Sequence, residues 1–242
     1  YAEKAGIDPK KMFVVSVMPC TAKKFECQRP EMARDGRPDV DVALTTRELA
    51  SMIKQARIDF NKLEDGRFDL MLGESTGAGV IFGVTGGVME AALRTVAEVA
   101  GGKEMADIEY TAVRGFEGIK ETEVKVGGIT VKAAVAHGTG NAKKLLNRVK
   151  NGEAHYDFIE IMGCPGGCIN GGGQPISMDK GEIVYADTMR SDSLYGLDKS
   201  APLRKSHQNP EVKKLYSEYL GSPNSDKAHQ LLHTHYVKRD RF

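Results

Sequence analysis

Residues 160–175 read EIMGCPGGCINGGGQP, a stretch in which Cys164 and Cys168 stand among glycines and Pro165, directly after an apolar run. Glycine carries no Cβ, so the backbone N–H groups of such a loop can come close to a bound group. Thiolates are the soft ligands that iron–sulfur clusters require. The stretch therefore predicts a loop built around an inorganic sulfur cluster.

Buried packing and zinc binding account less well for this cysteine pair. Free cysteines often behave as small buried hydrophobes, but a sharply turning loop of Gly and Pro is a poor place for a core side chain. Zinc sites usually hold cysteines in two matched pairs, and the sequence has no second matched pair. Ligation of an iron–sulfur cluster remains the favoured interpretation.

A second cysteine loop lies near the other end of the chain, where residues 17–24 read VMPCTAKK. Cys20 follows an apolar strand, as the main loop does, and Lys23 and Lys24 place positive charge beside it. A cationic setting suits an anionic cluster or its anionic ligands. Two such loops far apart in sequence predict one site closed by folding. Cys27 lies outside any glycine loop, and we interpret it as non-ligating.

Composition indicates a globular chain and excludes several classes of function. The 242 residues are 40% hydrophobic and 28% charged, and 34 basic residues against 33 acidic ones give a net charge of +1. This balance gives no basic surface for nucleic acid or for an anionic membrane, and no apolar run is long enough to span a bilayer. Four cysteines without disulfide-type spacing favour a reducing compartment, the cytoplasm. The periplasm stays open, because a chain that begins with Tyr1 rather than Met indicates a processed chain or an excerpt.

Alternating strand and helix patterns predict an α/β architecture with mostly parallel sheets flanked by helices. The expected strands are 12–17, 68–72, 108–113, 124–126, 129–136 and 156–161, and Gly127-Gly128 is the signal of a two-residue turn that joins 124–126 and 129–131 into a hairpin. The expected helices are 45–57, with Glu48 placed for a capping box, then 88–100, 141–149, 210–220 and 226–236. Both cysteine loops follow strands, and the carboxyl ends of strands are where open α/β sheets place their sites.

Two further patterns carry weaker signals. The glycine-rich loop 73–87 lacks the Gly-Lys-Ser/Thr ending of a phosphate cradle and the register of a dinucleotide fingerprint, so it predicts close backbone packing. His229, His233 and His235 have spacings that could bind a metal on a helix. Because they lie on an amphipathic terminal helix, we interpret them as surface groups or as groups that support a site without ligating a metal.

The motifs together resemble those of the FeFe-hydrogenases. The second and third signature motifs of that family are similar to residues 18–26, MPCTAKKFE, and to residues 160–175. Supporting resemblance runs through residues 79–94, GVIFGVTGGVMEAALR, and through residues 223–229, PNSDKAH. The resemblance covers essentially the whole chain. It implies the two-lobed iron-only hydrogenase large-subunit fold, with residues 1–242 as the carboxyl-terminal portion of its catalytic domain and no separate accessory domain.

The resemblance implies a cofactor called the H-cluster. This cofactor joins a 4Fe-4S cubane to a two-iron subsite that carries CO, cyanide and a bridging dithiolate. Carried over residue by residue, Cys20 and Cys164 would ligate the cubane, and Cys168 would ligate it while bridging to the two-iron subsite.

The surroundings of the two-iron subsite also follow from the resemblance. Lys23 would donate a hydrogen bond to a cyanide ligand, because a buried cyanide needs a donor. Met18 and Met162 would line the subsite, and Pro19 and Phe82 would form its wall. These types fit an apolar pocket that keeps water from the open iron position.

The implied activity is the reversible reduction of protons to dihydrogen, with electrons from a ferredoxin-like partner. The family's first motif, which supplies the fourth cubane cysteine and the proton-relay thiol, would lie upstream of Tyr1. We therefore expect a carboxyl-terminal fragment, or a chain with a separate partner, that does not hold an intact H-cluster alone.

Two alternatives share the resemblance. One is the hydrogenase-like iron–sulfur assembly and prelamin-binding proteins, which hold only a 4Fe-4S cluster, typically carry Ser where Gly166 stands and lack the Met-Pro-Cys motif with its Lys. Met18, Lys23 and Gly166 favour the catalytic branch over these proteins. The other is a sensory hydrogenase, whose distinguishing positions lie partly in the upstream segment.

Overall fold

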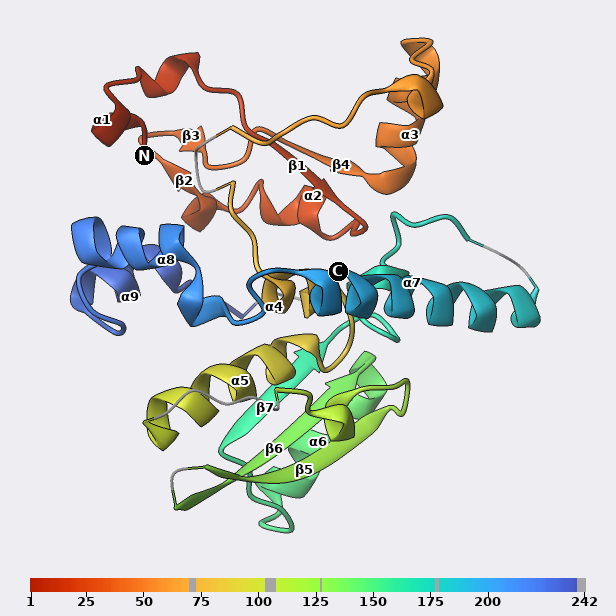
Figure 1. Cartoon of the computed structure of the whole chain (residues 1–242), viewed down its shortest axis with the longest axis vertical. Coiled ribbons are helices and arrows are strands. Elements are labelled where there is room, and N and C mark those ends of the chain that lie inside the picture. The colour runs from red at the N-terminus through yellow and green to blue at the C-terminus, as the bar shows by residue number, and fades with distance from the viewer. Residues whose placement is uncertain (70–72, 103–107, 127, 177–178, 239–242) are drawn as a thin grey trace. The chain divides into compact units, whose positions relative to one another are not determined.

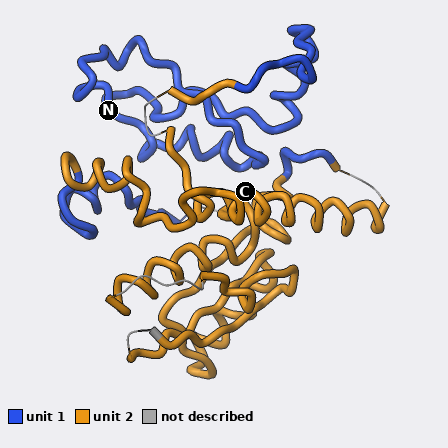
Figure 2. Tube along the Cα trace, viewed as in Figure 1, with its two compact units in different colours: residues 1–65, 172–175, 220–242 blue, residues 66–171, 176–219 orange. Residues whose placement is uncertain are grey.

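The structure is a computed structural model that describes residues 1–69, 73–102, 108–126, 128–176 and 179–238. The chain forms two compact units (Figure 2). Unit 1 comprises residues 1–65, 172–175 and 220–242, and unit 2 comprises residues 66–171 and 176–219. The elements are labelled in Figure 1, and each unit is described by itself.

Unit 1 is built around two parallel strands, β1 (Val15–Met18) and β4 (Val42–Thr45), whose register runs from Val15↔Val42 to Met18↔Thr45. The predicted strand at 12–17 is thus present, shifted toward the cysteine loop. The other elements of the unit are α1 (Ala2–Ala5), α2 (Lys23–Glu26), the short antiparallel pair β2 (Ala33–Arg34) and β3 (Arg37–Pro38), α3 (Thr46–Gln55) and α9 (Asp226–Leu232).

The predicted capping box opens α3. The Thr45 hydroxyl accepts the Glu48 N–H at 3.2 Å, and the Glu48 carboxylate accepts the Thr45 N–H at 2.8 Å. The bond from the Thr45 N–H, followed by one from the Lys24 ammonium, lowers the pKa of Glu48 to about 2. The box fixes where β4 ends and α3 begins, as the sequence predicts.

Unit 2 contains a three-stranded sheet in the order β5-β6-β7. Strands β5 (Ile119–Val126) and β6 (Ile129–His137) form the predicted antiparallel hairpin, and β7 (Phe158–Met162) pairs with β6 in parallel. The described sheets therefore combine parallel and antiparallel pairs within the predicted α/β class. The helices of this unit are α4 (Gly77–Val80), α5 (Gly87–Gly101), α6 (Thr139–Lys150), α7 (Lys180–Ser200) and α8 (Pro210–Leu215).

Helices α5 and α6 cover opposite faces of this sheet (Figure 1). Successive side chains of a strand point to opposite faces. Accordingly, Ala133 and Val135 of β6 pack with Met89 of α5, whereas Ala134 and Ala136 pack with Leu145 of α6. The uninterrupted apolar run of β6 is explained by burial on both sides, and it holds β7 and the loop that follows it in place.

Two predicted strands are corrected by the structure. The prediction of a strand at 108–113 is wrong, because Thr111–Val113 form a 3₁₀ turn and the Ile108 carbonyl accepts the Arg94 side chain at 3.0 Å instead of a neighbouring strand. The predicted strand at 68–72 is not present at Phe68 and Asp69. Phe68 is 89% exposed and gains no burial that would favour a strand, and the rest of this segment lies outside the described residues.

The helix α7 was not predicted, because its apolar residues are spread around the helix and give weak periodicity. Its start does carry a cap, since the Asp179 carboxylate accepts the N–H groups of Gly181 and Glu182 at 2.7 and 3.0 Å. The helix expected at 210–220 is α8 continued by a π-helical turn over Tyr216–Leu220, and α9 ends at Leu232, short of the expected 236. Among the described residues, none of the helices combines the length and apolar character that crossing a membrane requires.

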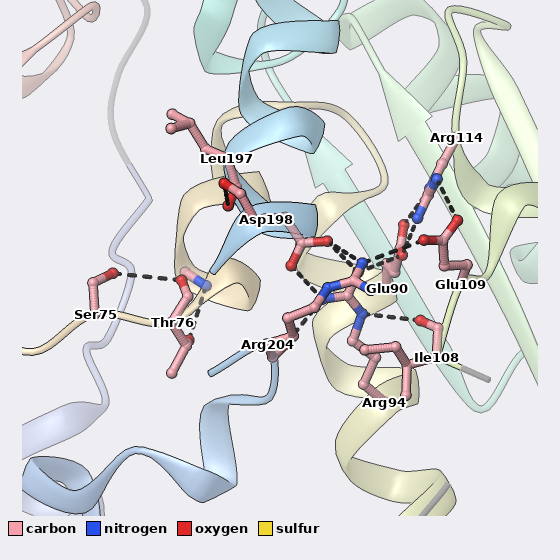
Figure 3. Close-up of polar contacts among 12 residues, drawn as sticks. Ser75, Thr76, Glu90, Arg94, Ile108, Glu109, Arg114, Leu197, Asp198 and Arg204 are labelled. Carbon is pink, nitrogen blue, oxygen red and sulfur yellow. Dashed lines mark hydrogen bonds and ion pairs between the residues drawn. The ribbon is translucent and has the colours of Figure 1, made fainter. Parts of the chain in front are cut away.

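A buried cluster of ion pairs fastens α7 to α5 in unit 2 (Figure 3). The Arg94 guanidinium lies 2.7 Å from both the Glu90 and the Asp198 carboxylates, and all three side chains are essentially inaccessible to water. Arg114 pairs with Glu90 and Arg204 with Asp198, each at 2.6 Å. Buried charges are costly unless they are paired, so this cluster makes a specific link between α5 and the end of α7.

Candidate metal centre

The main cysteine loop of unit 2 begins where β7 ends. Cys164 is half-buried, and the exposed Cys168 starts a 3₁₀ turn over Cys168–Asn170. The Gly167 N–H donates to the Cys164 carbonyl at 3.1 Å, and the Gly171 N–H donates to the Cys168 carbonyl at 2.9 Å. Each cysteine therefore opens a tight turn, and this places two thiols on one short loop.

The glycines of this loop are required by its geometry. Gly166 and Gly167 have φ values of +78° and +99°, a range that side chains rarely adopt. A Cβ on Gly167 would lie 2.6 Å from the Thr85 nitrogen and 3.0 Å from the Met162 sulfur. The cysteine loop thus packs directly against the backbone of loop 73–87, in agreement with the close backbone packing predicted for that loop.

The peptide groups of Gly166 are held at both ends. Its N–H donates to His137 Nδ1 at 3.0 Å, and its carbonyl accepts the Thr85 N–H at 3.0 Å. His137 Nε2 lies 3.2 Å from the Phe116 carbonyl, and the His137 residue is only 7% exposed. Protein atoms alone therefore fix the middle of the Cys-x-x-x-Cys segment.

A buried carboxylate, Glu160, and a buried ammonium, Lys120, hold the backbone segments that lie next to the cysteine loop. Glu160 of β7 accepts the Gly86 and Met89 N–H groups, each at 2.7 Å, and so caps the start of α5. Burial raises the pKa of Glu160, although these two bonds oppose the change. Lys120 donates to the carbonyls of Thr85 and Gly115 at 3.2 and 2.7 Å, and burial lowers its pKa to about 8.

The first cysteine loop belongs to unit 1. Met18 ends β1 with 40% exposure, Pro19 follows, and Cys20 is half-buried. Lys23 begins α2, and its ammonium lies 2.6 and 2.8 Å from the two Glu26 carboxylate oxygens. The structure therefore places a thiol and a paired cation within one short turn after the strand.

A glycine segment of unit 1 packs against this first loop. The Gly173 N–H donates to the Pro19 carbonyl at 3.1 Å, and Arg47 binds the carbonyls of Gly172 and Gly173 through its side chain and its N–H. A Cβ on Gly173 would lie 2.7 Å from Thr45 Cβ. In the sequence this segment follows Cys168 after only three residues.

The predicted site residues fall into two groups, one in each unit. Unit 1 holds Met18, Pro19, Cys20 and Lys23, and unit 2 holds Phe82, Met162, Cys164 and Cys168. Within unit 2, Met162 contacts the cysteine loop at Gly167, and Phe82 lies in a 3₁₀ turn (Ile81–Gly83) with 44% exposure. Within the residues that the structure covers, no group of three or more His, Cys, Asp or Glu side chains is placed to hold a metal ion.

The residues interpreted as non-ligating lie elsewhere. The Cys27 thiol donates to the Lys24 carbonyl at 3.3 Å, within α2 and the turn after it. The His229 and His233 rings contact one another in a tilted arrangement, with centroids 4.4 Å apart and an interplanar angle of 56°, and His235 lies beyond the end of α9. Sequence reasoning did not single out His137, Thr85, Glu160 or Lys120 as supports of the cysteine loop. His137 ends an apolar strand just as the cysteine loops follow theirs, and that signal could have identified it.

The donor set fits an iron–sulfur cluster. The thiols of Cys164 and Cys168 are soft ligands, and the positive-φ glycines between them let the loop turn tightly enough to carry both thiols within five residues. The Thr85 hydroxyl oxygen, beside this loop, is buried and finds no hydrogen-bond partner within the described part of the chain. The chemistry of the loop agrees with the cluster that the sequence predicts.

Family models assign the chain. Residues 1–172 match the model described as "Iron only hydrogenase large subunit, C-terminal domain", and residues 186–239 match "Iron hydrogenase small subunit". The chain belongs to the iron-only hydrogenase family. The residues of both cysteine loops lie inside the first match, so the resemblance of their motifs to FeFe-hydrogenases is confirmed.

Similar proteins are considerably longer than this chain, and they include hydrogenases. The NADP-reducing hydrogenase subunit HndD of Solidesulfovibrio fructosivorans is 52% identical over 241 residues, which are 100% of this chain and 40% of HndD. Iron hydrogenase 1 of Clostridium pasteurianum is 49% identical over 98% of this chain and 42% of its own length. Protein NAR1 of Arabidopsis thaliana is 32% identical over 96% of this chain and 51% of its own length. The chain thus spans about half or less of these curated relatives.

Solved structures confirm the fold that the resemblance implied. The FeFe-hydrogenase HydA(deltaEFG), studied for stepwise H-cluster assembly, superimposes with a TM-score of 0.79 at 44% identity, over 98% of this chain and 65% of that chain. HydA1 from Chlamydomonas reinhardtii gives a TM-score of 0.78 at 43% identity, over 98% and 66% of the two chains. The α/β fold is therefore that of the iron-only hydrogenase large subunit.

Proposed function

We propose that this chain is part of the catalytic domain of an FeFe-hydrogenase, which reversibly reduces protons to dihydrogen with electrons from a ferredoxin-like donor. The observation that carries the proposal is the preformed Cys164–Cys168 loop, whose glycines are fixed by protein contacts and whose sequence lies inside the family match. The 52% identity to a hydrogenase subunit over the whole chain supports it further.

The proposed cofactor is the H-cluster, bound by residues of both cysteine loops. Cys20 and Cys164 would ligate the 4Fe-4S cubane, and Cys168 would ligate it and bridge to a two-iron subsite with CO, cyanide and a dithiolate. When bound, this group supplies the electron transfer and the metal on which protons are reduced. The fourth cubane cysteine is proposed to come from the part of the hydrogenase that this chain does not include.

The role of the chain is to hold and shield the cofactor. The two hydrogen bonds of Gly166 hold the backbone between Cys164 and Cys168, from which both thiolates would reach the cluster. Met18, Met162, Pro19 and Phe82 would supply the apolar surface that excludes water. Lys23 is proposed to donate to a cyanide ligand, with Glu26 holding its ammonium near the start of α2.

The test compares two cysteine variants of the complete hydrogenase that contains this chain. Cys168→Ser is expected to remove the CO and cyanide infrared bands and the dihydrogen turnover. Cys27→Ser is the matched control, because its thiol is held by the Lys24 carbonyl, and it should keep both. Persistent CO and cyanide bands in the Cys168 variant would contradict the bridging role.

The second candidate is an iron–sulfur assembly protein that holds only a 4Fe-4S cluster, and the identity of 32% to NAR1 brings it into consideration. Gly166 favours the hydrogenase. Its φ of +78° and the 2.6 Å between a built Cβ and the Asn170 side-chain nitrogen disfavour the Ser typical of assembly proteins. A 4Fe-4S signal without CO or cyanide bands in the complete protein would select the assembly function, and bands without turnover would select a sensory hydrogenase.

A further inference from the structure

The His137 side chain is buried and hydrogen-bonded to the backbone of the cysteine loop at Gly166. It ends β6, opposite Met162 of β7 in the parallel register, and is 7% exposed. Its ring lies between the Gly166 N–H, 3.0 Å from Nδ1, and the Phe116 carbonyl, 3.2 Å from Nε2. Both neighbours are backbone groups, whose hydrogen-bonding roles cannot change.

These two neighbours define the state of the ring. A backbone N–H can only donate, so Nδ1 must accept from Gly166. A carbonyl oxygen can only accept, so Nε2 must carry the proton that is donated to Phe116. The arrangement therefore holds His137 as the neutral tautomer with its proton on Nε2.

In the sequence, the Gly166 N–H held by His137 belongs to the residue midway between Cys164 and Cys168. In iron–sulfur proteins, hydrogen bonds from backbone N–H groups to the cluster or cysteine sulfurs are one of the factors that set the reduction potential. An N–H that donates to an imidazole nitrogen is directed away from such sulfurs. The Gly166 carbonyl, which belongs to the next peptide unit, accepts the Thr85 N–H, so the backbone is held on both sides of the Gly166 Cα.

We infer that His137 is a positioning residue for the cluster: by accepting the Gly166 N–H at Nδ1, it fixes the Pro165–Gly166 peptide and withholds that N–H from the cluster sulfurs. This inference rests on the proposed function, because it requires a cluster on this loop. Its consequence is a lower reduction potential of the cubane than the same loop would give with the N–H released.

Three substitutions separate this role from simple packing. In His137→Asn, the amide group lies where Nδ1 stands, so the bond to Gly166 can persist while the bond to Phe116 is lost. In His137→Gln, the amide reaches the position of Nε2, so the bond to Phe116 can persist while the bond to Gly166 is lost. His137→Phe removes both bonds and keeps an aromatic ring.

The first measurement is the midpoint potential of the cubane in the complete hydrogenase, followed by electron paramagnetic resonance during a redox titration. We expect a shift to more positive potential in the Gln and Phe variants and a potential near that of the unmodified protein in the Asn variant. A purely structural role predicts the opposite order of shifts. The Gln variant would then differ least from the unmodified protein, since its amide preserves the hydrogen bond to the Phe116 carbonyl. Equal potentials in all four proteins, or a larger shift for Asn than for Gln, would overturn the inference.

The second measurement is amide hydrogen exchange at Gly166 in the protein stripped of clusters. In the unmodified protein this amide should be protected, and in the Gln and Phe variants it should exchange about fivefold to tenfold faster, as expected for the loss of one neutral hydrogen bond. An unprotected Gly166 amide in the unmodified protein refutes the inference without any variant. Failure of the unmodified, reconstituted protein to bind a cluster would instead refute the proposed function, which keeps the two failures distinct.

Discussion

Gly167→Ala is the substitution that most directly tests whether the cysteine loop is as tightly built as its geometry indicates. Gly167 has φ +99° and ψ −162°, a conformation that is accessible almost only to glycine. A methyl group there would lie 2.6 Å from the Thr85 nitrogen and 2.9 Å from the Gly83 oxygen. Both are backbone atoms, which cannot rotate away as the end of a side chain can.

The expected loss of stability in Gly167→Ala has two sources, the backbone strain and the steric clash. Forcing a non-glycine residue into this region costs about 1–3 kcal/mol, and overpacking against a fixed backbone costs about 1–3 kcal/mol more. A middle value of about 4 kcal/mol corresponds to a fall in melting temperature of about 12 °C, at roughly 3 °C per kcal/mol for a chain of this size. The matched control is Gly163→Ala in the same loop, where a Cβ meets nothing within 4 Å.

The assay is thermal unfolding of both variants and the unmodified chain, each without clusters, followed by iron content after reconstitution of the complete hydrogenase. Gly167→Ala should unfold at the lower temperature and bind less iron, whereas Gly163→Ala should stay within about 0.5 kcal/mol of the unmodified chain. If Gly167→Ala unfolds at essentially the same temperature as the Gly163 control and binds as much iron, the loop is not held against loop 73–87 and the reasoning is wrong.

Two other predictions concern the buried charges of unit 2. Asp198→Asn should lower the free energy of unfolding by about 3–5 kcal/mol in urea titrations, because it leaves Arg94 buried without its full partner. Burial raises the pKa of Asp198, but the bonds from Arg94 and Arg204 outweigh it and the net pKa is lowered. The contribution of this carboxylate is therefore present above its ordinary pKa of 3.8 and is lost as the pH falls through the folded value, a loss that Asp198→Asn should not show. Lys120→Met should change the response to alkali: because burial lowers the Lys120 pKa from 10.5 to about 8, the unfolded chain binds more protons between these values and the native protein gains stability as the pH rises. Unfolding measured from about pH 7.5 to about pH 10 should show a gain of roughly 2 kcal/mol in the free energy of unfolding that the Met variant lacks, and identical slopes would contradict the lowered pKa.

The parts of the fold that could be predicted are those with local chemical signals. Two residues, Thr45 and Glu48, are enough to predict the capping box. The hairpin of β5 and β6 is predicted by alternating residues on either side of Gly127-Gly128 in the sequence. The start of α7 has such a signal in Asp179, but the body of the helix lacks an apolar face, because the Arg94–Asp198 ion pair, rather than a hydrophobic stripe, fixes its contact with α5. Pairing of two charges 104 residues apart leaves no local pattern.

The candidate site shows the same division. The cysteines and glycines could be recognised directly, because thiolates and positive-φ positions require particular residue types. The supports of the loop act through ordinary residues in unremarkable sequence: His137 and Glu160 are recognisable only once β6 and β7 are paired. The strand predicted at 108–113 failed for a related reason, since a distant arginine takes the carbonyl that a neighbouring strand would have used.

The hydrogen bonds on both sides of Gly166 have a consequence for the binding of the proposed cluster. Because both bonds are made by protein atoms, the conformational entropy of this loop is lost when unit 2 folds and need not be lost again on ligand uptake. Binding of a preassembled cluster would then carry no cost for ordering this loop, and its affinity would not be reduced by that cost. By mass action, most of that binding free energy would add to the stability of the folded state, and cluster loading would be readable as a rise in melting temperature.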